Sequence, residues 1–157
     1  MIKQELYSET VLDAAKEVFE TMIFMEIEPS ESAAAANQTQ TLMGSITFKG
    51  KLEGCLVISL AEPCALSVAR NMLALDPEET VSSTEVCDAI GEVANMVMGS
   101  IKSRLQESFP DIEVSIPSVV SGKELQNTLG ERYEQACVPV CIDEDFEAVF
   151  ILFYKEK

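Results

Sequence analysis

Four residues at the spacing of one helix face carry the chemistry that most needs explaining in this sequence. Asp88, Glu92, Asn95 and Gly99 fall within a sector of about 60° on a helix that turns roughly 100° per residue. The carboxylates can pair with a cation, the carboxamide can hydrogen-bond, and the glycine leaves a notch that a partner's backbone can approach closely. A plainer interpretation is a solvated helix face, with glycines that mark close packing against a sheet.

Few other residues offer catalytic chemistry. The 157-residue sequence has no histidine, so the common mixed zinc sites cannot form. Cys64 and Arg70 have the Cys-x5-Arg spacing of a cysteinyl-phosphate cradle, but the residues between them contain no glycine and follow a helical period. The five cysteines include no C-x-x-C pair, and we expect most of them to be reduced and buried, with Cys137 and Cys141 as small core residues on one strand face.

The charge balance excludes several classes of partner. Eleven basic residues against 27 acidic ones give a formal net charge of −16, which repels nucleic-acid phosphates and anionic lipids. The longest apolar run near either end, 148–153, is far shorter than the ~18 residues of a membrane span, and residues 1–10 contain no apolar signal core. We therefore expect a cytoplasmic protein that binds neither nucleic acid nor membranes and favours partners with basic faces.

Hydrophobic periodicity predicts an α+β fold, in which helices pack on one face of a mainly antiparallel β-sheet within a single domain, 1–157. Three segments have a helical period, and the last of them starts with a Ser82/Glu85 capping box: 9–26, 62–73 and 82–107. Five segments are rich in β-branched and aromatic residues and predict strands: 42–48, 52–60, 113–120, 133–142 and 146–154. Segments 26–40 and 121–132 are predicted to be loops.

An internal repeat connects the first helix with the long helix. The run DAAKEV at 13–18 matches DAIGEV at 88–93, which indicates two pseudo-repeated halves, about 9–75 and 82–157. At the same offset Glu20 stands where the second copy has Asn95, and Phe24 stands where it has Gly99. We therefore expect the halves to share a scaffold but not a complete site.

The motif Asp88-x3-Glu92-x2-Asn95-x3-Gly99 resembles the signature of the CheC, CheX and FliY family of chemotaxis phosphatases. Pro117-x4-Gly122 is similar to a less specific part of the family's pattern. The resemblance covers the element order of nearly the whole chain. CheC members usually carry the motif in both halves and CheX members in one, so the single copy here most resembles CheX.

The resemblance implies a phosphatase that hydrolyses the aspartyl phosphate of a CheY-type response regulator. Asn95 would orient the attacking water and Glu92 would pair with a receiver lysine, with Asp88 as support at the rim and Gly99 as clearance. No cofactor is expected on this chain, because the receiver brings its own Mg²⁺. The resemblance also implies a homodimer joined through sheet edges, one of which residues 148–153 could supply.

Two alternatives compete with this interpretation. The chain can be a non-catalytic module that sequesters a receiver without hydrolysis, although binding alone does not require an amide at position 95. The acidic segments 26–31, 76–79 and 143–145 can also be considered as divalent-cation loops. They lack the alternating oxygen ligands, glycine and terminal glutamate of an EF-hand, so solvated loops are favoured.

Overall fold

The computed structural model describes residues 2–31, 40–122 and 132–157, which form helices and one sheet. The helical elements are α1 (Ile2–Val18), the π-helical turn η1 (Phe19–Ile23), α2 (Glu62–Met72) and α3 (Ser83–Arg104). The strands are β1 (Ile27–Pro29), β2 (Thr41–Lys49), β3 (Leu52–Ala61), β4 (Glu113–Val114), β5 (Ser118–Gly122), β6 (Glu134–Ile142) and β7 (Phe146–Glu156). None of the helices in these ranges is long and apolar enough to cross a membrane.

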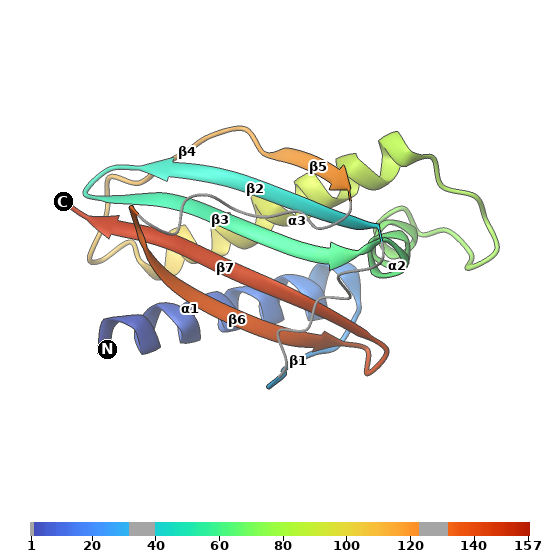
Figure 1. Ribbon diagram of the computed structural model, residues 1–157, viewed down its shortest axis with the longest axis horizontal. Coiled ribbons are helices and arrows are strands. Elements are labelled where there is room, and N and C mark those ends of the chain that lie inside the picture. The colour runs from blue at the N-terminus through green and yellow to red at the C-terminus, as the bar shows by residue number, and fades with distance from the viewer. Residues whose placement is uncertain (1, 32–39, 123–131) are drawn as a thin grey trace.

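These strands form one antiparallel sheet with the order β1-β6-β7-β3-β2-β4. Strand β5 also pairs with β2, along residues 41–45, whereas β4 pairs with residues 48 and 49. The order is symmetric about the central β3–β7 pair. Each half contributes one hairpin to the centre, and a short strand from the other half pairs with that hairpin's outer strand. Figure 1 shows α1, α2 and α3 together on the far side of the sheet. The predicted α+β class, with helices on one face, is confirmed, while the exact limits of the two halves stay a prediction.

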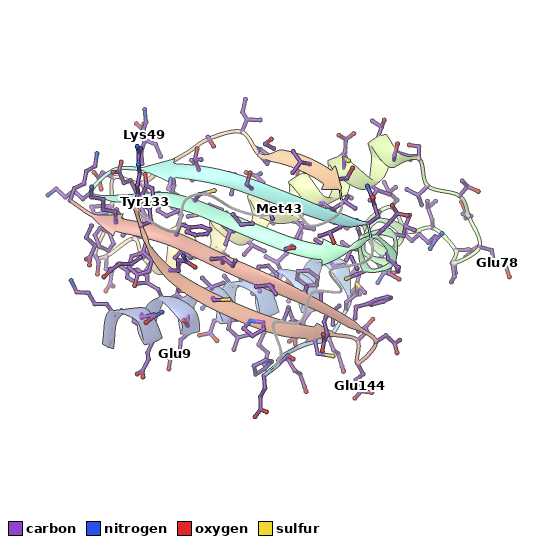
Figure 2. All side chains as sticks on the ribbon, in the orientation of Figure 1. Glu9, Met43, Lys49, Glu78, Tyr133 and Glu144 are labelled. Carbon is purple, nitrogen blue, oxygen red and sulfur yellow. The ribbon has the colours of Figure 1, made fainter. Side chains whose placement is uncertain are left out.

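The main core lies between the helices and the sheet. Alternate residues of β3, Leu56, Ile58 and Leu60, are buried against the helices, as the period of two in a strand requires. On the opposite face Cys55, Val57 and Phe153 form a second, smaller cluster. Met43 and Tyr133, labelled in Figure 2, pack against that second cluster. Both faces of the central strands are therefore buried.

The first helix begins earlier than its hydrophobic period predicts. It starts at Ile2 instead of residue 9, because Tyr7 is only 3% exposed and its ring centroid lies 4.2 Å from that of Tyr154 on β7. One buried aromatic thus anchors a turn that is otherwise polar. At its other end the helix changes to the π-helical turn η1 and stops at Phe24, whose backbone is left-handed (φ 63°).

The short strands were the least predictable elements. The segment predicted as one strand over 113–120 is divided into β4 and β5, and β1 lies within the predicted loop 26–40. Residues 121 and 122 belong to β5, so the loop predicted over 121–132 begins later; residues 123–131 and 32–39 lie outside the described ranges. Strands of two or three residues carry no readable period and form because a neighbouring strand pairs with them.

The predicted dimer edge over 148–153 is wrong. These residues lie on β7, which is hydrogen-bonded to β3 on one side and to β6 on the other. An interior strand has no free edge to offer a second chain.

The cysteines are all free, but fewer are buried than the sequence predicts. Cys55 and Cys64 are buried, whereas Cys137 is exposed and Cys141 is half-buried on the helix-free face of β6, so the core role predicted for that pair is wrong. Cys64 lies in the regular helix α2, and burial raises the pKa of its thiol to about 12. The side chain of Arg70 donates from Nε to the carbonyl oxygen of Glu79 at 3.1 Å. A cysteinyl-phosphate cradle is therefore not supported.

Candidate functional site

The long helix α3 holds the candidate site, and its start is fixed by the predicted capping box. Ser82 Oγ accepts from the backbone N–H of Glu85 at 3.1 Å, and Glu85 Oε1 accepts from the backbone N–H of Ser82 at 3.2 Å. Such a reciprocal cap satisfies two otherwise unpaired donors and favours one starting residue. The rotational phase of the whole helix then depends on which side chains enter the core.

The core face of α3 is buried as predicted. Ile90, Val93, Val97 and Ile101 are each 1% exposed or less. The opposite side presents the four residues of the motif, which we call the stripe: Asp88, Glu92, Asn95 and Gly99. All four members of the stripe are solvent-exposed. The structure therefore brings every predicted site residue onto one accessible face.

The polar side chains of the stripe are unengaged. Within the described ranges, no hydrogen bond or ion pair involves the side chain of Asp88, Glu92 or Asn95. Two carboxylates and a carboxamide held on a rigid helix can therefore bind an incoming partner without first breaking an internal contact. A cation, or a group that needs a hydrogen-bonding amide, fits this face.

The two glycines of α3 have different environments. A Cβ built on Gly91 would lie 3.6 Å from Val119 and 3.7 Å from Pro117, so Gly91 packs beneath the segment that leads into β5. A Cβ built on Gly99 would meet none of the residues that the structure describes within 4 Å. Close packing explains Gly91 but not Gly99. The open space over Gly99 fits the predicted role of clearance for a partner.

In the first half of the chain, the described residues 2–31 and 40–75 form no equivalent stripe. Glu17, which matches Glu92 in the repeat, accepts hydrogen bonds from Ser100 Oγ at 2.9 Å and from an Arg104 guanidinium nitrogen at 3.1 Å. Its carboxylate therefore joins α1 to α3. Glu20 then falls in η1, where the helix no longer has the α-helical phase. The matching positions of the first half therefore have a different arrangement from the stripe, and the expectation that this half lacks a complete site stays a prediction.

No metal-binding cluster accompanies the stripe. In the part of the chain that the structure describes, no three His, Cys, Asp or Glu side chains are grouped closely enough to hold an ion. What the stripe can provide by itself is charge, an oriented amide and room for close approach.

One apolar side chain beside the stripe departs from the predicted helical period. Met22 falls at an apolar position of the period predicted over 9–26, but its side chain is 58% exposed, and Phe24 at the end of η1 is 77% exposed. The π-helical turn η1 explains the exposure of Met22. Successive residues of a π-helix are rotated by a smaller angle than those of an α-helix, so the side chain of Met22 no longer points into the core. The sequence contains one indication of this difference. Phe24 stands at the repeat position where the second copy has Gly99, so the two copies are expected to differ in structure at this point.

Comparisons with known proteins place the stripe within a family. A model of the family described as chemotaxis phosphatase CheX matches residues 42–141, which include all four stripe residues. The chain is 28% identical over 107 residues to the CheY-P phosphatase CheX of Thermotoga maritima, covering 68% of each sequence.

Solved structures agree with this match. The chemotaxis protein CheX of Vibrio vulnificus is 27% identical, with a TM-score of 0.78 over 95% of this chain and 96% of that one. The Borrelia burgdorferi CheX, solved as a complex of CheX, CheY, BeF3 and Mg²⁺, has the same fold, with a TM-score of 0.73 over 96% of this chain and 98% of that one at 19% identity. Because the family match extends over most of the chain and contains the motif, this protein belongs to the CheX family of chemotaxis phosphatases.

Proposed function

We propose that this protein hydrolyses the aspartyl phosphate of a CheY-type receiver domain, with Asn95 and Glu92 as the catalytic residues. The observation that carries the proposal is the stripe itself, in which an acid and an amide stand one turn apart on an exposed, rigid helix with unengaged side chains. The curated relative from Thermotoga maritima is named a CheY-P phosphatase, which supports the reaction class.

The chemistry needs little more than positioning. Water attacks phosphorus in line, the bond from phosphorus to the aspartyl oxygen breaks, and the products are the free carboxylate and dihydrogen phosphate. Catalysis of such a loose displacement depends on placing the nucleophile and stabilising charge. The Asn95 carboxamide, which both accepts and donates hydrogen bonds, orients the water.

Glu92 docks the helix on the receiver. A receiver lysine beside the phosphoryl group pairs with the Glu92 carboxylate, which sets how far Asn95 enters the receiver's site. Asp88, one turn toward the N-terminus, supports the pair from the rim. The receiver's own Mg²⁺ neutralises phosphoryl charge, so this acidic chain need not bind phosphate alone against a net charge of −16.

The direct test is the decay of a phosphorylated CheY-type receiver, in Mg²⁺, with and without this protein. We expect the protein to accelerate the decay and Asn95→Ala to remove most of the acceleration, on the order of 10²-fold. Glu20→Ala is the matched control, because Glu20 occupies the Asn95 position of the first half, where no stripe forms. Tight binding without acceleration would instead support a sequestering module, and retained activity in Asn95→Ala would contradict the assigned amide.

A further inference from the structure

A groove runs beside the stripe, between the end of α1 and α3. It has a volume of about 410 Å³, and its apolar lining comes from Val18 and Met22 on one side and from Met96 and Gly99 on the other. One liquid water occupies roughly 30 Å³, so the groove has room for at least one apolar side chain. Gly99 is common to the groove and the stripe, so the two are continuous.

Two members of the apolar lining, Met22 and Gly99, are exposed to solvent, whereas Val18 is buried. Met22 is 58% exposed, and the space over Gly99 is open. A single exposed apolar side chain is ordinary, as Leu6 on the first turns of α1 shows at 55%. Met22 differs from Leu6 because it stands in a groove opposite a second methionine, Met96, which is itself half-buried. The two methionines give a small apolar surface next to Gly99, where a partner bound at the stripe can cover it.

The charged residues at the groove already bind each other. Glu17 pairs with Arg104 at 3.1 Å, and Ser100 Oγ donates to Glu17 at 2.9 Å and accepts from Arg104 Nε at 3.2 Å. Among the described residues that line the groove, this network pairs both charged side chains, so neither is free to attract a polar ligand. An occupant is therefore recognised there by apolar contact.

The position of the groove identifies the occupant. Gly99 follows Asn95 by four residues, or about 6 Å along the helix axis. A protein that places its phosphoryl group at Asn95 therefore covers the groove as well. A second copy of this chain is disfavoured, because each copy carries a net charge of −16 and both would present acidic helices.

We propose that the groove holds an apolar side chain of the phosphorylated receiver. This side chain lies about 6 Å from the receiver's phosphoaspartate, which is the distance between Asn95 and Gly99 along the axis of α3. The proposal rests on the proposed function and adds a determinant of receiver choice to it. Methionine side chains adapt to several shapes, so Met22 and Met96 accept leucine, isoleucine, valine or methionine at that position of the receiver. A receiver with a charged residue there would be rejected, because its charge would lose water without gaining a partner.

The contact is the same in the bound substrate and in the transition state, so it contributes to affinity more than to turnover. The test measures the dissociation constant of a beryllofluoride-activated receiver for the wild-type protein, Met22→Ala, Asn95→Ala and the control Leu6→Ala. Leu6 is matched to Met22 in exposure but lies near the start of α1, about 24 Å along the helical axis from Met22 in η1. We expect Met22→Ala to weaken binding about tenfold and to raise KM by the same factor, while Leu6→Ala stays within about twofold of wild type.

Each outcome decides a different question. If the wild-type protein binds the receiver and Met22→Ala binds it equally tightly, the groove does not hold a receiver side chain, but the proposed function stands. No receiver binding by the wild-type protein overturns both. Gly99→Leu provides a second variant, since its side chain would fill the groove, and unimpaired binding by it would also overturn the proposal. Sedimentation of the same variants identifies the rival occupant, because dissociation of a dimer by Met22→Ala would assign the groove to a second copy.

Discussion

Gly99→Ala is expected to raise the stability of the protein and to lower its phosphatase activity. Glycine inside a helix destabilises it by about 0.5–1 kcal/mol relative to alanine. A Cβ at Gly99 has no neighbour within 4 Å among the described residues, so no steric penalty from them offsets this gain. For a chain of this length the melting temperature should rise by about 2–3 °C. The added methyl group would stand where the receiver must approach, and an overpacked contact of this kind lowers kcat/KM about tenfold.

Gly91→Ala provides the matched control for this prediction. It gives the same gain in helix propensity, and its Cβ would make only ordinary contacts at 3.6 and 3.7 Å beneath β5. We expect it to raise the melting temperature without changing receiver dephosphorylation. Calorimetric melting and receiver-decay assays on both variants separate stability from activity. Wild-type activity in Gly99→Ala would refute the argument that a partner approaches closely there.

Three further predictions address docking, packing and pH. Glu92→Gln keeps the shape of the side chain but removes its charge, so kcat/KM for the receiver should fall about tenfold or more and depend less on salt; an unchanged salt dependence would contradict the lysine pairing. Gly54→Ala should lower the free energy of unfolding in urea by about 3 kcal/mol or prevent folding, because its Cβ would overlap the carbonyl oxygen of Phe153; a stable variant would show that β3 and β7 can separate. Burial raises the pKa of Tyr7 to about 12. The pKa of Tyr7 in the folded protein thus exceeds its unfolded value of about 10. The contribution of Tyr7 to the free energy of unfolding is therefore fully present below pH ~10, and it should decrease by about 2 kcal/mol as the pH rises toward 12. Tyr7→Phe should show a smaller decrease, and an equal one would exclude Tyr7 as the cause.

The features that the sequence predicts best are those of α3, the helix that packs on the sheet and also carries the stripe. The capping box and the buried positions of α3 determine its phase, and that phase alone places Asn95 and Glu92 on the exposed side. These are local features, so the motif and its orientation could be predicted without knowledge of the rest of the fold.

The errors arose where distant contacts override local pattern. Tyr7 extends α1 by stacking on β7, which is more than 140 residues away in sequence. The interior place of β7 depends on pairing with both β3 and β6, which periodicity does not encode. The helical period predicted over 9–26 would keep Met22 on the apolar face only if the α-helical phase continued through η1, which it does not. The groove beside the stripe follows from that π-helical turn, so it could not be inferred from sequence.

Comparing receiver binding with turnover in Asn95→Ala tests most directly whether Asn95 carries the catalysis. The variant and the wild-type protein are each brought to saturation with a phosphorylated CheY-type receiver in Mg²⁺, and the single-turnover rate of phosphate release is measured. We expect Asn95→Ala to bind the receiver within about threefold of wild-type affinity and to release phosphate about 10²-fold more slowly, because the amide acts on the water and not on docking. A saturated rate equal to that of the wild-type protein would contradict the claim that Asn95 carries the catalysis.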